Sequence, residues 1–236
     1  MTALCIAHRG ASGEAPENTL KAFELAIEQR ADMIETDLHL TRDGRVLLAH
    51  DSDLAGAELA SRSFEELRLR APQVPTLEEA LELCGGRIPF NLELKTGRGG
   101  RYEGLERRVL EVVRSFDLLE RTLFSCFDDR VLMQLHELEP SARIALLVAP
   151  GTAADVEKRA ARVGAEAVNP ALRLAKPKRI AELHSAGLRV YVYTVDAPAA
   201  TLRLLQAGVD GIFTNYPGRL REQIELFASV GSEKPT

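Results

Sequence analysis

Residues 189–214 read RVYVYTVDAPAATLRLLQAGVDGIFT, and their order of apolar and polar positions decides the fold. A β-rich run at 189–195 is followed by an amphipathic pattern at 199–206 and by a second β-rich run at 211–214. Short β-rich runs that alternate with stretches of helical period are typical of parallel strands joined by helices. This segment therefore predicts one strand–helix–strand unit.

The same alternation runs through most of the chain. The predicted strands are Leu4–Ala7, Met33–Leu38, Pro89–Leu94, Thr122–Phe127, Arg143–Val148, Ala165–Asn169, Arg189–Val195 and Gly211–Thr214. The predicted helices are Thr19–Gln29, Leu77–Cys84, Leu105–Phe116, Arg130–Glu137, Ala154–Val163, Pro177–Ala186, Ala199–Gln206 and Arg219–Phe227. Eight strands, each followed by a helix, in a chain of 236 residues predict an α/β fold, a single (β/α)8 TIM barrel. An open doubly wound sheet is the alternative, although such sheets more often stop at about five or six strands.

One further β-rich run, Arg45–Ala49, departs from this alternation. It follows the second strand across a stretch that ends in Asp43-Gly44, and an Asp-Gly pair between apolar runs favours a β-hairpin. We therefore expect a short β-hairpin insertion after strand 2. Residues 1–230 are expected to form one barrel domain, with a frayed tail at 231–236.

Composition and charge exclude several classes of protein. Hydrophobic residues make up 45% of the chain and charged residues 28%, which is ordinary for a globular domain. The net charge of -5 argues against a nucleic-acid partner. No apolar run approaches a membrane span, and residues 1–10 lack a signal-peptide pattern, so we expect a cytoplasmic protein. Cys5, Cys84 and Cys126 have no ligand-like spacing and are expected to be buried free thiols in a reducing compartment. The oligomeric state stays open.

Polar residues gather at the predicted strand ends, where a barrel of this kind carries its active site. They are His8 and Arg9 after strand 1, Glu35 and Asp37 in strand 2, His50 after the hairpin strand, and Asn91, Glu93 and Lys95 in strand 3. Because side chains alternate along a strand, Glu35 and Asp37 share one face. Glu93 and Lys95 share a face for the same reason, and the apolar residues between these positions point toward the helices.

Three carboxylates are thus expected to point into the barrel mouth. Burying a carboxylate without a partner is costly, and a second negative charge nearby increases the cost. Protonation or a bound cation would remove it, and oxygen ligands suit Mg²⁺, Ca²⁺ or Mn²⁺ rather than zinc. Simpler interpretations compete for each motif alone: a solvated edge for Glu35 and Asp37, an internal ion pair for Glu93 and Lys95, and a loop pair for His50 and Asp51. Their position at neighbouring strand ends favours one common site.

These residues lie within longer motifs. Residues 8–10 read His-Arg-Gly, 16–19 Pro-Glu-Asn-Thr, 35–37 Glu-Thr-Asp, 41–44 Thr-Arg-Asp-Gly, 50–51 His-Asp, 75–79 Pro-Thr-Leu-Glu-Glu, 91–95 Asn-Leu-Glu-Leu-Lys and 210–217 Asp-Gly-Ile-Phe-Thr-Asn-Tyr-Pro. Together they resemble the glycerophosphodiester phosphodiesterase family, from residue 7 to about residue 220.

The resemblance implies a metal-dependent enzyme that hydrolyses a small glycerophosphodiester to glycerol 3-phosphate and an alcohol. The implied site consists of His8 and His50 as the acid–base pair, Glu35, Asp37 and Glu93 as metal ligands, and Arg9 and Lys95 as phosphate-binding residues. One divalent cation is implied, Mg²⁺ or Ca²⁺, with Mn²⁺ as an alternative. Tyr193 stands where the family often has a tryptophan, and either lines the substrate or packs in the core. Which histidine acts as the acid stays open.

Several details leave alternatives. Glu17 and Asn18 have two interpretations, as residues that reach the site or as part of a helix start, and we favour Asn18, together with Thr19, as the cap of the following helix. Residues 52–74 are shorter than the corresponding insertion of many relatives, which implies an open mouth and admits lysophospholipase D activity on single-chain lipids. Asp196 replaces a commoner asparagine, and Cys126 a commoner serine. An isomerase or aldolase would need a Gly-rich phosphate loop, and a non-catalytic domain would be expected to lose a site residue.

Overall fold

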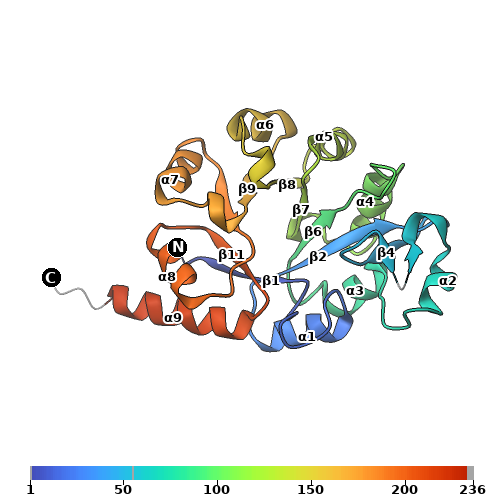
Figure 1. Cartoon of the computed structure of the whole chain (residues 1–236), viewed down its shortest axis with the longest axis horizontal. Helices are drawn as coiled ribbons and strands as arrows, with labels where there is room; N and C mark the ends of the chain where they lie inside the picture. Colours follow the sequence, from blue (N-terminus) through green and yellow to red (C-terminus); the bar gives the residue numbers. More distant parts are fainter. Residues whose placement is uncertain (1, 55, 233–236) are drawn as a thin grey trace.

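Eight parallel strands close into a barrel (Figure 1). The computed structural model describes residues 2–54 and 56–232. The parallel strands are β1 (Leu4–His8), β2 (Met33–Leu40), β6 (Phe90–Leu94), β7 (Thr122–Cys126), β8 (Arg143–Val148), β9 (Ala167–Pro170), β10 (Arg189–Val192) and β11 (Gly211–Thr214). Strand β1 pairs with both β2 and β11, which closes the sheet on itself. The predicted (β/α)8 TIM barrel is confirmed.

Helices form the outer layer of the barrel. They are α1 (Leu20–Glu28), α3 (Leu77–Cys84), α4 (Leu105–Ser115), α5 (Asp129–Leu138), α6 (Val156–Val163), α7 (Pro177–Ser185), α8 (Pro198–Gln206) and α9 (Pro217–Ser232). Single 3-10 turns lie at η1 (Leu59–Ser61), η2 (Leu119–Arg121), η3 (Pro150–Thr152) and η4 (Leu172–Leu174). Helix α9 includes residues 231 and 232, where the sequence predicts a frayed tail, and residues 233–236 lie outside the described part of the chain.

Apolar side chains form two layers that follow the alternation of the strands. Outward-facing residues such as Ile34 and Leu92 pack in one continuous core with helix residues such as Phe23 and Leu81. Inside the barrel, a smaller cluster fills the space below the polar strand ends: Ile6, Met33, Leu123, Ala145, Ala167, Tyr191 and Phe213. The inward face of the strands is therefore apolar at depth and polar only at the carboxyl end.

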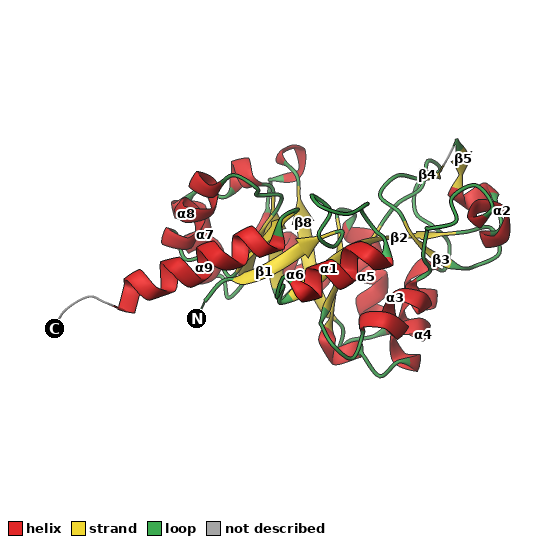
Figure 2. Cartoon of the chain, turned by 90° about the horizontal axis from the view of Figure 1, so that it is seen from below, coloured by secondary structure: helices red, strands yellow, loops and turns green. Residues whose placement is uncertain are grey.

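The hairpin insertion extends the barrel at β2. Strand β3 (Val46–Leu48) runs antiparallel to the end of β2, so β2 reaches Leu40 and is longer than predicted. Beyond β3 lie β4 (Asp53–Leu54), β5 (Ala57–Glu58) and α2 (Phe64–Arg68). Apolar residues of this segment pack on Leu47. Figure 2 shows β4, β5 and α2 beyond the carboxyl end of β2. The predicted hairpin is confirmed, whereas the predicted open mouth stays a prediction.

The structure also describes the cysteines, the apolar content of the helices and the end of β10. Cys5, Cys84 and Cys126 are buried and free, as predicted. No helix within residues 2–54 and 56–232 is both long and apolar enough to cross a membrane. The predicted cytoplasmic location stays a prediction. The strand predicted to end at Val195 ends at Val192, and only a single bridge at Tyr193 continues its pairing.

The turn after β1 brings the backbone of Gly10 against helix α1. Gly10 has a φ of +78°, and a Cβ there would lie 2.7 Å from the carbonyl carbon of Ala22. Gly10→Ala is therefore expected to lower the free energy of unfolding by about 3 kcal/mol, because left-handed strain and the steric clash act together. Gly44→Ala, at φ +77° with nothing within 4 Å, is the matched control for strain alone, at about 1 kcal/mol. Urea unfolding measures both, and equal losses would contradict the close contact.

Candidate active site

Strand register brings three carboxylates together at the carboxyl end of the barrel. Glu35 and Asp37 lie on β2, and Asp37 is the direct neighbour of Glu93 of β6 in the parallel pairing. One oxygen from each carboxylate lies within 4.8 Å of the others. Glu35 and Asp37 are buried, and the Glu93 side chain is only 12% exposed. Water therefore screens their mutual repulsion poorly.

This crowding changes the protonation of the carboxyl groups. Burial, together with the charges of Asp37 and Glu93, raises the pKa of Glu35 well above its ordinary value. Burial raises the pKa of Glu93 to about 7, although the charge of Lys95 opposes the shift. Burial also acts on Asp37, but the charges of Lys95 and Arg9 outweigh it and lower the pKa of that carboxyl group. The cluster thus consists of one stable anion, Asp37, and two carboxyl groups that bind protons more tightly than an exposed glutamate does.

Two cationic side chains face the carboxylates. Lys95 Nζ lies 2.9 Å from Glu93 Oε1 and 3.2 Å from Asp37 Oδ1. Arg9 Nε lies 3.1 Å from Asp37 Oδ2, and Arg9 Nη1 donates to Glu17 Oε2 at 2.8 Å. With Glu17 included, two cations face four carboxylates. The site therefore has an excess of negative charge when all of its acids are ionised.

The side-chain amide of Asn215 orients the His8 ring, and the Asp196 carboxylate fixes that amide. Asn215 donates to Asp196 through Nδ2 at 2.7 Å and through its main-chain N–H at 2.8 Å. The Asn215 amide oxygen is thereby directed to His8 and lies 2.8 Å from His8 Nδ1. Because that oxygen can only accept, His8 carries its proton on Nδ1 and its Nε2 lone pair is free. Burial and the charge of Arg9 lower the pKa of His8, so the ring is neutral at neutral pH.

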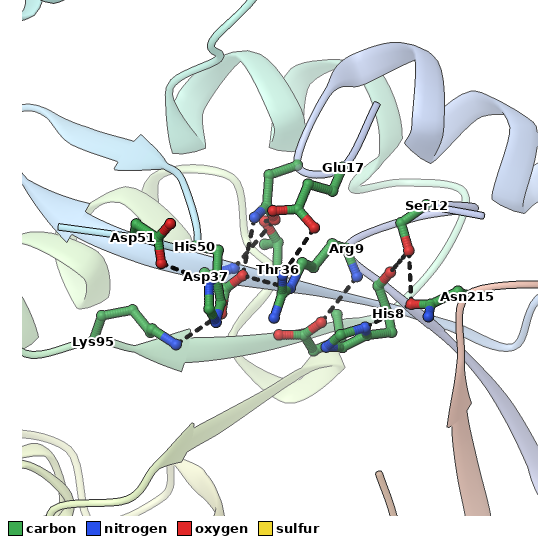
Figure 3. Close-up of polar contacts among 12 residues, drawn as sticks. His8, Arg9, Ser12, Glu17, Thr36, Asp37, His50, Asp51, Lys95 and Asn215 are labelled. Atoms are coloured by element: carbon green, nitrogen blue, oxygen red, sulfur yellow. Dashed lines mark hydrogen bonds and ion pairs between the residues drawn. The ribbon is translucent and has the colours of Figure 1, made fainter. Parts of the chain in front are cut away.

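His50 lies on the opposite side of the site from His8 (Figure 3). Its side chain is 39% exposed, and its Nδ1 lies 2.9 Å from Asp51 Oδ1. One cavity of about 200 Å³ is lined by His8, Arg9, Glu35, His50, Asn91, Glu93, Lys95, Ser125, Phe127, Leu147, Tyr193, Thr194 and Phe213. The structure thus brings all the predicted site residues except Asp37 to the wall of one cavity, and Asp37 lies behind it in contact with Arg9 and Lys95.

The loop before α1 contributes a residue that the sequence assigned to another role. Thr19 alone caps α1, by accepting from the Ala22 N–H. Asn18 is 3% exposed, donates to Asp37 Oδ2 at 2.9 Å and accepts from the Thr36 hydroxyl at 2.7 Å. The prediction that Asn18 caps the helix was wrong. Its backbone is left-handed, with φ 54°, a conformation that asparagine tolerates, so the helix starts only after Thr19.

Tyr193 both lines the cavity and packs against neighbouring residues, the two alternatives that the sequence left open. Its ring lines the cavity and packs edge-on against Phe127, with ring centroids 6.0 Å apart. Its hydroxyl donates to the main-chain oxygen of Val148 at 3.1 Å. Burial, followed by the charge of Glu93, raises the pKa of Tyr193 to about 12, so it remains a neutral donor.

Three further polar residues near the site were not predicted to belong to it: His39, and Asn215 and Asp196, which the sequence placed only in a motif and as a departure from the family pattern. His39 is 1% exposed and is the next inward-facing position of β2 after Asp37, so strand alternation could have found it. Burial lowers the pKa of His39 to about 4. Asn215 and Asp196 reach His8 only because the barrel closes, and no local pattern indicates that contact.

Known proteins resemble the chain over most of its length. Residues 8–219 match the Glycerophosphoryl diester phosphodiesterase family. The chain belongs to this family. It is 34% identical over 243 residues to a glycerophosphodiester phosphodiesterase from Bacillus altitudinis, a match that covers 93% of this chain and 98% of that protein. A glycerophosphodiester phosphodiesterase from Caldanaerobacter subterraneus is 31% identical over 237 residues, with 93% and 97% covered.

Among solved structures, a phosphodiesterase from Oleispira antarctica in complex with the product sn-glycerol-3-phosphate superimposes with a TM-score of 0.83 and 28% identity. The match covers 93% of this chain and 96% of that one. Family membership makes this chain an enzyme, a phosphoric diester hydrolase.

The carboxylate cluster of this phosphodiesterase fits a hard divalent cation. Glu35, Asp37 and Glu93 offer only oxygen donors, which Mg²⁺ and Ca²⁺ prefer. A cation would also offset the repulsion that contributes to the raised pKa values of Glu35 and Glu93. These residues could therefore hold such an ion, and binding would displace protons from them.

Binding of a divalent cation to this cluster is expected to strengthen with pH. Because Glu93 has a pKa of about 7, the cation must displace its proton in acid. For each displaced proton, affinity is expected to rise by up to about tenfold per pH unit below the pKa of that group. Calorimetric titration with Ca²⁺ or Mg²⁺ between about pH 5 and pH 8 measures this slope. Affinity that is constant over this range would contradict the proton displacement.

The metal-free protein is expected to show the complementary trend in stability. The folded-state pKa of Glu93 lies above its ordinary value of 4.5, so its contribution to stability is fully present below about pH 4.5 and is lost as pH rises through about 7. The gain in Tm on adding the cation therefore grows over the same interval. Glu93→Gln, which cannot ionise, is the matched variant. In the metal-free protein it is expected to make the Tm less dependent on pH between about 4.5 and 7.

Proposed function

We propose that this enzyme hydrolyses small glycerophosphodiesters to glycerol 3-phosphate and an alcohol, with one bound divalent cation and with His8 and His50 as its acid–base pair. The observation that carries the proposal is one cavity with a histidine on each side, two cationic side chains and the carboxylate cluster. The Oleispira antarctica phosphodiesterase was solved with sn-glycerol-3-phosphate as its product, which supports the product proposed here.

The proposed ligands of the cation are Glu35, Asp37 and Glu93, and the cation is Mg²⁺ or Ca²⁺, with Mn²⁺ as an alternative. When bound, such an ion polarises a phosphoryl oxygen and offsets the negative charge that develops during the reaction. Asn18 supports Asp37 from behind through its hydrogen bond of 2.9 Å, which fixes the direction of that carboxylate.

Arg9 and Lys95 are proposed to attract and hold the phosphate. Burial works against the charge of Lys95, but Glu93 and Asp37 outweigh it and raise the pKa of Lys95, so the side chain stays protonated. Arg9 adds a guanidinium, whose paired donors match phosphate oxygens. Because the whole chain has a net charge of -5, an anionic substrate depends on such local positive charge.

His8 is proposed as the general base and His50 as the general acid. The proton on His8 Nδ1 is committed to Asn215, so the free Nε2 lone pair accepts the proton of the attacking oxygen. His50, on the opposite side and more exposed, donates a proton to the alcohol oxygen as the bond to phosphorus breaks. This division of roles follows from the different surroundings of the two rings.

The remaining lining residues are proposed to recognise the organic parts of the substrate. Asn91 and Ser125 are buried in the cavity wall, and their side-chain polar atoms have no hydrogen-bond partner within the described residues. Unpaired buried polar groups are costly, so glycerol hydroxyls would satisfy them. Tyr193 and Phe127 form an aromatic wall that we assign to the substrate as well.

Release of glycerol 3-phosphate from glycerophosphocholine and glycerophosphoethanolamine tests the reaction. Activity is expected to disappear in EDTA and to return with Mg²⁺, Ca²⁺ or Mn²⁺, because the carboxylate cluster would otherwise repel the anionic substrate. Turnover that EDTA does not affect would remove the cation from the proposal. Turnover of single-chain lysolipids alone would replace the substrate and favour a lysophospholipase D.

Leaving-group dependence separates the roles of the two histidines. On glycerophosphocholine, whose alcohol leaves poorly, His8→Ala and His50→Ala are each expected to lower kcat/KM by about 10²–10⁴. On the p-nitrophenyl ester of glycerol 3-phosphate, which needs no protonation to leave, His50→Ala is expected to lose less than about tenfold while His8→Ala keeps its full loss. The reverse pattern would exchange the roles. His184→Ala, at a surface histidine bonded to Asp210, is the control and should retain wild-type activity.

A further inference from the structure

A buried histidine outside the cavity wall contacts the main chain of His50. His39, on β2, has its Nε2 3.3 Å from the carbonyl oxygen of His50. Its Nδ1 lies 2.6 Å from the hydroxyl oxygen of Tyr102, in the loop between β6 and α4. The His39 and Tyr102 rings also pack edge-on, with centroids 5.6 Å apart. His39 therefore links this loop to the segment that carries His50.

The chemistry of the partners fixes the direction of both hydrogen bonds. A carbonyl oxygen can only accept, so His39 Nε2 carries a proton and donates to His50. In the neutral ring, Nδ1 is then an acceptor, and the Tyr102 hydroxyl donates to it. Donation thus runs from Tyr102 through His39 to the His50 main chain, and each group has one compatible role.

The backbone around His50 has few other supports. The β2–β3 pairing ends at Leu48, and the Ala49 N–H then donates to the Asp37 carbonyl at 3.2 Å. Within the part of the chain that the structure describes, His39 is the hydrogen-bond donor to the His50 main chain. The partner of the His50 ring, Asp51, is itself 78% exposed and offers no rigid support.

A second contact fastens the loop of Tyr102 to the segment after His50. Arg98 Nη2 lies 2.7 Å from Asp53 Oδ2, three residues beyond His50. Gly97 makes room for the tyrosine, because a Cβ at this position would lie 3.0 Å from the Tyr102 ring. The loop after β6 is therefore joined to the segment that carries His50 directly through Arg98 and Asp53, and indirectly through Tyr102 and His39.

We infer that His39 is a positioning residue for His50, and that Tyr102 fixes the orientation of the His39 ring. The inference rests on the proposed function, since it concerns the placement of the proposed acid. Small displacements of a catalytic group lower the rate of the chemical step more than they lower substrate affinity. Loss of the bond from His39 should therefore appear in kcat rather than in KM.

Steady-state kinetics on glycerophosphocholine test this role with three variants. His39→Leu removes both hydrogen bonds and is expected to lower kcat by about 10–100-fold with KM changed less than about twofold. His39→Gln retains one donor and one acceptor and is expected to restore kcat to within about threefold of wild type. Tyr102→Phe keeps the ring packing and is expected to give an intermediate loss of about three- to tenfold.

A double-mutant cycle with His50→Ala shows whether His39 acts through His50. In the His50→Ala background, His39→Leu is expected to change the residual kcat by less than about twofold, because the positioned group is already absent. Losses that multiply in the double variant would overturn the inference. Equal losses for His39→Gln and His39→Leu would also overturn it, since hydrogen bonding would then not be the cause.

Two controls exclude other causes of a lower kcat, namely altered cation binding and unfolding. The Mg²⁺ concentration for half-maximal activity should change less than about threefold in His39→Leu, and a larger change would assign the effect to the neighbouring Asp37. Tm measurements identify any variant that is unfolded, and His39→Gln keeps the test valid if His39→Leu is unstable. If His50→Ala itself retained wild-type activity, the proposed function would fail. If His50→Ala lost most of its activity while His39→Leu kept the wild-type kcat, only the positioning role of His39 would be contradicted.

Discussion

The crowding of three buried carboxylates at one end of the barrel is the constraint on which the other features of the site depend. Glu35, Asp37 and Glu93 would repel one another strongly in surroundings with little water. Arg9 and Lys95 neutralise part of this charge, and the repulsion that remains contributes to the raised pKa values of Glu35 and Glu93. The separation of the carboxylates is set by strand register, because Asp37 and Glu93 are paired residues of adjacent strands. The barrel therefore fixes the backbone positions from which the three carboxylates project.

The two histidines reach this cluster from different structural settings. His8 is the last residue of β1, and its ring is held by Asn215 and Asp196 from the opposite end of the sequence, so closure of the barrel orients it. His50 lies beyond the hairpin strand, outside the parallel sheet, and is more exposed. One side of the cavity is thus part of the barrel framework, and the other belongs to an inserted segment. A substrate bound between them would touch both.

Local periodicity was sufficient to predict the barrel and the common face of Glu35 and Asp37, because both depend only on neighbouring residues. His39 obeys the same alternation and follows Glu35 and Asp37 on the inward face of β2, but its contacts with His50 and Tyr102 depend on residues outside that strand. Asn18 suits a helix cap equally well, and its left-handed backbone and its hydrogen bonds to Asp37 and Thr36 decide against that role. The contact of His8 with Asn215 joins residues 207 positions apart and follows from the closed topology, which no local pattern reports.

The segment between β3 and α3 starts and ends at adjacent points in space. The Leu48 N–H donates to the Pro75 carbonyl at 3.0 Å, and Leu47 forms an antiparallel bridge with Thr76. Residues added or removed between these points would leave β2 and its carboxylates in place. The fold therefore tolerates insertions and deletions in this stretch. Because His50 lies near the start of this stretch, insertion or deletion beyond Asp51 would alter the surroundings of one wall of the cavity and leave the carboxylates on β2 and β6 in place.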